Sequence, residues 1–268
     1  MKCYNVTYRY FDVVGQHAFL EEVVLKVNLS LQKMSESIDL KNIRFNFIDT
    51  EQTDQVSFEL KPQLLGVVKS YDQDVLADIY QDNISMAVWQ RQLGAVSQYA
   101  ESLLVSAPNF VFKSHGSSEQ LNTTLTKLLP DAQHKGLFVE DVTLLVDMFA
   151  CLFDLKEVGL RLNVLSSAMC PRFHVDKIPC RLVSTYAGIG SEWLHEAHVI
   201  RDRLGLGGHV ADHNSGLHEK GRINRLNVGD VALMKGDEWP TSLGRGVVHR
   251  SPSASDTKKR LFLSLDMI

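Results

Sequence analysis

The chain has 268 residues, with 28 Lys and Arg against 32 Asp and Glu, which gives a formal net charge of −4. Apolar residues make up 44% and charged residues 22%, as in ordinary globular proteins with a sizeable core. The mild acidity argues against a general nucleic-acid or membrane-surface role, and no apolar stretch is long enough to span a bilayer. Because the amino terminus has no apolar signal core, we expect a cytoplasmic protein.

The first 155 residues predict a mixed, mainly helical scaffold. Alternating apolar residues at 43–48 and 56–60 are typical of half-buried strands. Residues 18–31 are compatible with a helix, and 73–79 begin another. None of these segments carries a chemical signature, so we expect them to pack around a sheet.

Three longer helical patterns follow. Apolar residues recur at roughly helical spacing over 84–104. Ser117 or Ser118 can cap a second helix, which Pro130 stops. Residues 139–153 predict a third helix that is buried on most of its surface.

From residue 158 the hydrophobic period becomes that of strands. Residues 158–165 alternate, and further short strands are predicted at 181–186, 228–234, 246–249 and 260–267. Glycine-rich turns separate them, and no long helix intervenes. This pattern predicts an antiparallel barrel or jelly roll in the carboxyl-terminal part, hence an α+β chain.

His174 and Asp176 are the most informative pair of residues. In an extended segment they project to the same face, with Cα atoms roughly 6.5 Å apart, so both can reach one ion. His249, on a distant predicted strand, would complete a set of two histidines and one carboxylate. That set leaves coordination positions open and is the arrangement used by non-haem Fe(II) oxygenases.

Arg260 follows His249 by eleven residues and begins a predicted strand. On that strand Arg260 shares a face with Phe262, whereas the leucines at 261, 263 and 265 share the other face. If the leucines pack on the helices, Arg260 points into the barrel and requires an anionic partner. The distal carboxylate of 2-oxoglutarate would serve, and so would a structural Asp or Glu.

The order of these motifs resembles that of the Fe(II)/2-oxoglutarate dioxygenase superfamily. More closely, residues from about 84 onward resemble an uncharacterised bacterial family, domain of unknown function 1826 (DUF1826), above all over residues 170–194. The resemblance implies a double-stranded β-helix, of jelly-roll and cupin-like type, over residues 156–268, flanked by the mixed region 1–155. It also implies that His174, Asp176 and His249 are the catalytic metal ligands.

Other residues compete for the co-substrate. Arg181 lies on an early strand, from which some superfamily members bind the keto acid. Arg250 neighbours His249 and should face the opposite way, so it ranks lower. The hydroxyl of Tyr186 is a candidate hydrogen-bond donor to the co-substrate, although a tyrosine packed in the core fits the pattern as well. Glu192 and Trp193, near the mouth of the barrel, are candidates for substrate contact.

Five further histidines lie between the ligand segments, at positions 195, 198, 209, 213 and 218. Their density allows a zinc site, whereas a polar lid is the simpler interpretation. Zinc also competes with Fe(II) at the predicted site itself, because the Irving–Williams order favours it for the same ligands.

The sequence therefore favours an Fe(II)- and 2-oxoglutarate-dependent dioxygenase that hydroxylates a small molecule or a protein side chain. The first alternative is a cupin-like protein holding zinc or another divalent metal for isomerisation, hydrolysis or metal handling. The second is a non-catalytic module whose barrel binds a ligand. No basic stripe with interleaved aromatic residues predicts a nucleic-acid partner.

Overall fold

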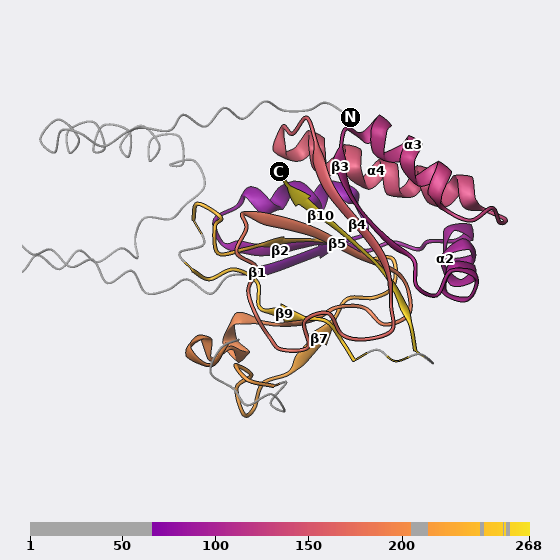
Figure 1. Ribbon diagram of the computed structural model, residues 1–268. Coiled ribbons are helices and arrows are strands. Elements are labelled where there is room, and N and C mark those ends of the chain that lie inside the picture. Colours follow the sequence, from indigo (N-terminus) through magenta and orange to yellow (C-terminus); the bar gives the residue numbers. More distant parts are fainter. Residues whose placement is uncertain (1–65, 205–213, 242–243, 254, 256–257) are drawn as a thin grey trace, which may run out of the picture. The chain divides into compact units, whose positions relative to one another are not determined.

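The computed structural model describes residues 66–204, 214–241, 244–253, 255 and 258–268 (Figure 1). The strands and the helix predicted before residue 61 lie outside this part of the chain. The described chain is mixed α+β, built around one large sheet. That sheet has the order β1-β2-β8-β5-β10-β4-β3. Its strands are β1 (Gly66–Ser70), β2 (Ile84–Trp89), β3 (Val111–Gly116), β4 (Val158–Leu165), β5 (Cys180–Ala187), β8 (Val231–Lys235) and β10 (Arg260–Met267).

Within the large sheet, β10 lies between β5 and β4 and pairs antiparallel with both. Only β1 and β2 run parallel. The bounds predicted for residues 158–165 and 260–267 agree with those of β4 and β10, because apolar residues alternate on both strands. Strands on both sides of residue 155 share this sheet, and the division of the chain at that residue stays a prediction.

Three α-helices and a 3₁₀-helix accompany the large sheet (Figure 1). They are η2 (Gln73–Tyr80), α2 (Ala95–Ser106), α3 (Ser118–Leu128) and α4 (Lys135–Phe153). Ser117 caps α3 as predicted: its hydroxyl accepts from the backbone of Gln120, whose side chain accepts from the backbone of Ser117 in return. The third predicted helix is confirmed as α4, which begins four residues earlier than expected.

The continuous helical pattern predicted over residues 84–104 is wrong in its first half. Residues 84–89 form β2, and the helix begins only at Ala95, after Gly94 at φ 53°. Four of the six β2 residues are buried, because this strand lies inside the sheet between β1 and β8. A strand buried on both faces is continuously apolar, so its pattern does not distinguish it from a buried helix.

A second, smaller sheet has the order β7-β6-β9. Its strands are β6 (Glu192–Leu194), β7 (Ile223–Arg225) and β9 (His249–Arg250). Two single-turn 3₁₀-helices, η3 (Glu196–His198) and η4 (Arg201–Arg203), follow β6. In β6 and β9, Trp193 is the register partner of His249, and Glu192 is that of Arg250.

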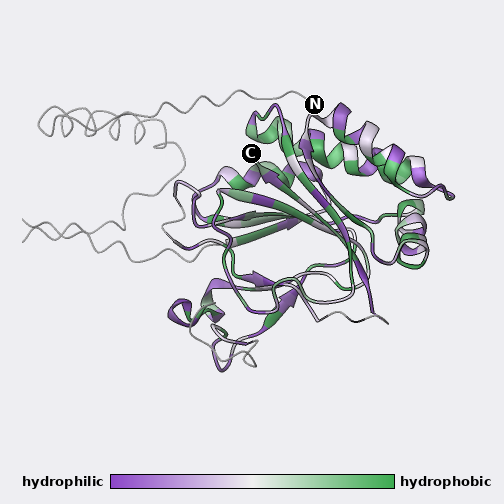
Figure 2. Cartoon of the chain, in the orientation of Figure 1, coloured by the Kyte–Doolittle hydropathy of each residue, from purple (hydrophilic) through white to green (hydrophobic). Residues whose placement is uncertain are grey.

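The two faces of the large sheet are covered differently. Leucines 261, 263 and 265 of β10 pack with buried residues of α2, α3 and α4 in the main core. On the other face, a second cluster joins residues of β2, β5 and β8 to Trp193 of the small sheet, with Phe262 against it. Figure 2 shows hydrophobic residues along the central strands and on α4. The interior between the two sheets is therefore the side to which Phe262 and Trp193 point.

A charged network is buried on the helical side of the large sheet. Arg91 makes two hydrogen bonds to the carboxylate of Asp141 in α4, at 2.6 and 2.9 Å. The hydroxyl of Tyr186 donates to the same carboxylate at 2.6 Å. Burial raises the pKa of Tyr186 well above its usual value, so this hydroxyl remains a donor. Asp141 thus satisfies two buried donors that come from different segments.

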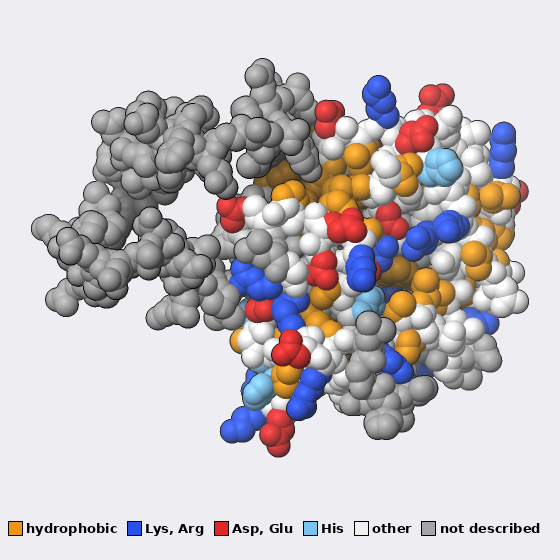
Figure 3. Space-filling view, turned by 60° about the vertical axis from the view of Figure 1, so that its left-hand side comes forward, with side chains coloured by type: hydrophobic (Ala, Val, Ile, Leu, Met, Phe, Trp, Pro, Cys, Tyr) orange, Lys and Arg blue, Asp and Glu red, His pale blue; other side chains and the backbone are white. Residues whose placement is uncertain are grey.

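None of the helices in the described residues has both the length and the apolar character needed to cross a bilayer. On the face shown in Figure 3, Lys and Arg side chains are interspersed with Asp and Glu. That mixture is in keeping with the small net charge of the chain.

Replacing Asp141 with Ala should lower the free energy of unfolding by about 3 kcal/mol, because it leaves the guanidinium of Arg91 buried without its carboxylate. Urea unfolding followed by circular dichroism measures the change. Asp147→Ala is the matched control, since Asp147 is an exposed aspartate of the same helix. Equal effects of the two substitutions would contradict a stabilising role for the network.

Candidate metal centre

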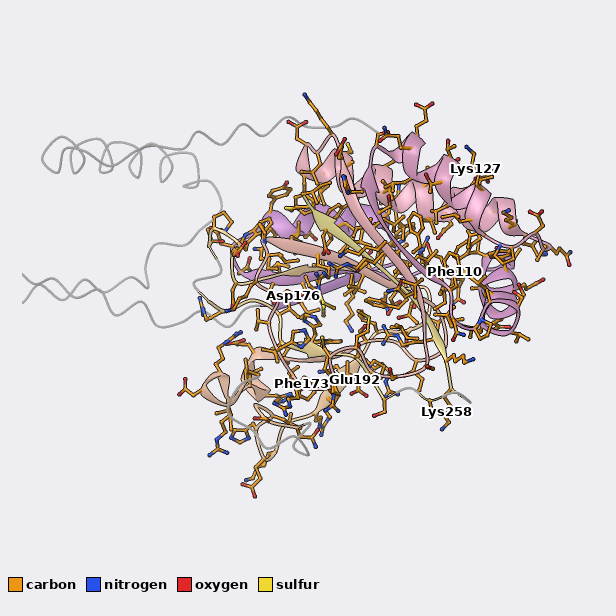
Figure 4. The ribbon with its side chains drawn as sticks, viewed as in Figure 1. Phe110, Lys127, Phe173, Asp176, Glu192 and Lys258 are labelled. Atoms are coloured by element: carbon orange, nitrogen blue, oxygen red, sulfur yellow. The ribbon has the colours of Figure 1, made fainter. Side chains whose placement is uncertain are left out.

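His174, Asp176 and His249 converge in the interior between the sheets. One ligand atom of each lies within 4.8 Å of the other two. The Nε2 atom of His174 is 3.7 Å from Oδ1 of Asp176, and that of His249 is 3.4 Å from Oδ2. Figure 4 labels Asp176 between the large sheet and the two segments that carry Phe173 and Glu192. The structure therefore brings together the three residues that the sequence predicts as metal ligands.

Both imidazoles present the same nitrogen to this centre. Nδ1 of His174 lies 2.9 Å from the carbonyl oxygen of Arg172, and Nδ1 of His249 lies 3.1 Å from that of Val247. A carbonyl can only accept, so each Nδ1 carries a proton and donates it, and Nε2 is the nitrogen that faces the centre. Backbone carbonyls that orient a histidine in this way are typical of metal sites.

His249 is buried, whereas His174 and Asp176 are half-buried. Burial lowers the pKa of His249 to about 4, with the nearby Asp176 carboxylate opposing that shift. The imidazole of His249 is consequently neutral at physiological pH. A neutral imidazole is the form that binds a metal ion.

Backbone contacts hold the ligand segments together. His174 and His249 exchange two backbone hydrogen bonds of 3.0 Å, although His174 belongs to no longer strand. The backbone N–H of Asp237 donates to the carbonyl of Asp176 at 2.9 Å. Gly236 allows this close approach, because a Cβ there would lie 2.0 Å from the carbonyl oxygen of Ile178. The glycine after β8 thus positions the loop that carries the carboxylate.

Arg181 is fully engaged with carboxylates. Its NH1 donates to Oδ2 of Asp176 at 2.7 Å, and its Nε donates to Oδ1 of Asp266 at 2.6 Å. Asp266 shares a strand face with Arg260, as the alternation on β10 predicts. Arg181 therefore holds the carboxylate of Asp176 in place, a role that the sequence analysis missed. The alternating pattern of β5 and β10 contained the signal, because it places Arg181 and Asp266 on the interior face.

Arg250 also has a carboxylate partner, and its side chain lies on the face of the small sheet opposite to that of His249. It donates to Oε2 of Glu192 at 2.8 Å, and its guanidinium carbon lies 4.2 Å from the ring centroid of Phe173. This placement confirms that Arg250 points away from the side chain of His249. Glu192 accepts from Arg225 as well, so both of its oxygens are used within the small sheet.

Among the residues that the structure describes, Arg260 has no such carboxylate partner. Its side chain is 1% exposed, and its NH2 donates to Oγ of Ser191 at 3.1 Å. Nε and NH1 of Arg260 are buried without a hydrogen-bond partner among the described residues. The guanidinium carbon lies 4.5 Å from the ring centroid of Phe262. Burial lowers the pKa of Arg260 to about 10, so the side chain remains a cation at neutral pH.

Gly188 allows the backbone of Arg260 to pass beside the end of β5. Gly188 has φ 87°, and a Cβ there would lie 2.4 Å from the carbonyl oxygen of Lys259 and 2.8 Å from Cα of Arg260. The pairing of β5 with β10 shifts register between Leu261 and Phe262. The glycine turn recognised in the sequence therefore packs directly against the start of the strand that carries the unpaired arginine.

Tyr186 does not join the metal centre. Its ring packs at 4.9 Å from that of Phe138 in the main core, and its hydroxyl donates to Asp141. Leu182 lies in the same core and has the same strand parity as Tyr186. This parity is the signal that places Tyr186 on the helical side of the sheet, away from His174 and His249.

The remaining histidines form no further metal group in the part of the chain that the structure describes. His209 and His213 lie outside the described residues. His195 and His198 have ring centroids 6.2 Å apart, and the Nδ1 of each accepts from a backbone N–H. In His218, Nδ1 likewise accepts from the backbone of Lys220. These rings act as local caps for the turns that follow β6.

The family model described as Protein of unknown function (DUF1826) matches residues 70–266. The chain belongs to this family. The match includes all three residues of the metal centre and Arg260. No curated protein matches the chain.

Among solved structures, the chain is similar to the dioxygenase for auxin oxidation 1 of Arabidopsis thaliana in its 2-oxoglutarate complex. The identity is 10% and the TM-score 0.45, over 76% of this chain and 92% of that one. The rice dioxygenase for auxin oxidation is 13% identical, with a TM-score of 0.44 over 76% of this chain and 83% of that one. A prolyl-4-hydroxylase of Pseudomonas putida is 12% identical, with a TM-score of 0.36 over 71% of this chain and 95% of that one. Likenesses this weak carry no argument about this chain.

Replacing Arg260 with Met should raise the stability of the metal-free protein by about 1–3 kcal/mol. Met fills much of the same space without a buried cation, and only the Ser191 hydrogen bond and the Phe262 contact are lost. Urea unfolding in the presence of a chelator measures the difference. Arg250→Met is the control and should destabilise, because it deprives the buried Glu192 of a partner. A loss of stability in both variants would mean that Arg260 has a compensating partner.

Proposed function

We propose that this protein is an Fe(II)- and 2-oxoglutarate-dependent dioxygenase that hydroxylates a small molecule or a protein side chain. The observation that carries the proposal is the combination of a His-Asp-His centre with a buried arginine that has no anionic partner in the described part of the chain. We further propose that the two sheets are the two sides of a double-stranded β-helix. The triad would then lie inside the barrel.

The donor set fits Fe(II). Two neutral imidazoles and one carboxylate are the ligands of the two-histidine, one-carboxylate oxygenases, and three protein ligands leave positions for a co-substrate. His174 and His249 would bind through Nε2, since Nδ1 of each is engaged by the backbone. Asp176 would bind the metal through one carboxylate oxygen, while Arg181 keeps its hydrogen bond to the carboxylate. When bound, the iron would supply oxygen activation coupled to decarboxylation of the keto acid.

Arg260 is the residue that fits the distal carboxylate of 2-oxoglutarate. The two competing arginines are already paired, Arg181 with two aspartates and Arg250 with Glu192. Nε and NH1 of Arg260 remain as buried donors, and a carboxylate is the acceptor that matches a guanidinium best. Ser191 would orient the guanidinium through NH2.

The surrounding chain would exclude water from the reaction. Trp193 and Phe262 come from opposite sheets and pack in one apolar cluster beside the triad and Arg260. An apolar lining strengthens the interaction of Arg260 with a carboxylate, because fewer water molecules compete for the same donors. The chain's own residues would thus bind and orient the co-substrate, and the substrate class remains the open part of the proposal.

Anaerobic titration of the metal-free protein with Fe(II) and then 2-oxoglutarate tests the proposal. A weak visible charge-transfer band of the chelated keto acid should appear only when both are present. His174→Ala should lose metal binding. Arg260→Ala should keep the metal and weaken 2-oxoglutarate binding by about tenfold or more, since a charge-assisted hydrogen bond is removed. Arg222→Ala, a substitution of an exposed arginine, is the control and should bind like the wild type.

The cupin-like alternative makes the opposite prediction. One zinc ion bound per chain, with no 2-oxoglutarate binding to the Fe(II)-loaded protein, would replace the dioxygenase with a divalent-metal protein of another activity. Ligand binding that persists after His174→Ala and Asp176→Ala together would support a non-catalytic module.

A further inference from the structure

Trp193 is the second buried donor without a partner in the interior between the sheets. The residue is 4% exposed, and its Nε1 has no hydrogen-bond partner among the described residues. An indole N–H that is removed from water without an acceptor is unfavourable by about 1–3 kcal/mol, and buried tryptophans usually find a partner. A hydrogen-bond acceptor on a bound ligand would remove this unfavourable free energy.

The position of Trp193 is set by the pairing of β6 with β9. Trp193 and His249 are register partners, so their side chains project from the same face of the small sheet. That face is the inner one, since Trp193 packs with residues of β2, β5 and β8. The indole therefore neighbours a residue of the metal centre across one pair of strands.

Trp193 and Arg260 are linked indirectly, through Phe262. Phe262 packs against the cluster that contains Trp193, and the guanidinium of Arg260 lies over the Phe262 ring. The partner of Arg260, Ser191, precedes Trp193 by two residues. Ser191, which contacts Arg260, and Trp193, which lies opposite His249, are therefore two residues apart, the side-chain period of a strand. A ligand bound between the metal centre and Arg260 would therefore occupy the interior to which Trp193 also points.

We propose that the indole N–H of Trp193 donates a hydrogen bond to an oxygen of 2-oxoglutarate bound between the metal centre and Arg260. This inference rests on the proposed function and adds a co-substrate-binding residue to it. Trp193 then differs in role from the surface substrate contact that its place near a glycine turn predicts. Its unpaired N–H and those of Arg260 serve one ligand from two different sheets.

The first test compares dissociation constants on the anaerobic Fe(II)-loaded protein. Trp193→Phe keeps an aromatic ring and removes the N–H donor, so the Kd for 2-oxoglutarate should rise about tenfold while the Kd for Fe(II) stays within twofold. Trp89→Phe is the matched control. The Nε1 of Trp89 donates to the carbonyl of Tyr71, so this substitution should leave the Kd for 2-oxoglutarate unchanged.

The second test measures the wild-type chain, and a variant of Trp193 serves only to assign the Trp193 signal. The chain has three tryptophans, so nitrogen-15 labelling gives three indole signals, and the one missing in a variant of Trp193 is assigned to it. With Zn(II) as a diamagnetic metal, saturation with 2-oxoglutarate should shift the Trp193 signal and slow its hydrogen exchange. The Trp89 signal should stay in place.

The outcomes separate this inference from the proposed function. Unchanged binding in Trp193→Phe, together with an unmoved indole signal while Arg260→Ala still weakens binding, would overturn the role of Trp193 and leave the dioxygenase intact. A wild-type protein that binds metal and no 2-oxoglutarate would overturn both. Weakened binding with a shifted indole signal would establish the contact.

Discussion

Two backbone hydrogen bonds between His174 and His249 connect the parts on which the site depends. They tie the loop before β5 to β9, and β9 is in turn an edge of the small sheet. The loop continues directly into β5, which lies inside the large sheet. One short antiparallel contact therefore fixes the distance between two candidate metal ligands and joins the two sheets. Without this contact, the two histidines would lie on segments that are ordered independently. The entropy lost in bringing them together would then weaken the binding of a metal ion.

The buried arginines divide into those that the polypeptide neutralises and one that it does not. Arg91 and Arg181 each meet a carboxylate within 2.7 Å, and Arg250 meets one at 2.8 Å. An isolated buried charge is strongly destabilising, so such pairing is what a folded chain requires. Arg260 is more deeply buried than these three, at 1% exposure, and among the described residues it meets only a hydroxyl and an aromatic ring. The guanidinium of Arg260 is therefore a candidate for binding an anionic ligand.

Much of this arrangement could be predicted from alternation alone. The strict parity of β10 places Arg260 on the interior face and its leucines on the helical face, and the structure confirms both. The capping box at Ser117 is equally local, so its helix was predictable. The pairs His174 with His249 and Arg181 with Asp266 join residues more than seventy positions apart. Their spacing carries no periodic signal, so the sequence predicts the residue types and not the contacts.

The error at β2 has a physical cause, which is burial on both faces. In β2 an apolar run suits a strand inside the sheet as well as a helix, and only the sheet order decides between them. For Tyr186 and Trp193 an amphipathic aromatic residue is compatible with either a core or a site. In the structure, the two residues differ in whether the polar atom of the side chain has a hydrogen-bond partner. The hydroxyl of Tyr186 meets Asp141, whereas the N–H of Trp193 meets no acceptor among the described residues.

Unsatisfied donors on both sheets also bear on how ligand binding affects the fold. Arg260 belongs to the large sheet and Trp193 to the small one, and each is destabilised by the absence of an acceptor. A single anion that accepts from both removes two unfavourable terms and adds a contact between the sheets. Binding then stabilises the native state by more than either hydrogen bond alone, because the backbone link between His174 and His249 and the ligand constrain the same interface. Under the proposed function, the unfavourable burial of these donors in the ligand-free protein would therefore be relieved on binding and would add to the affinity for the ligand.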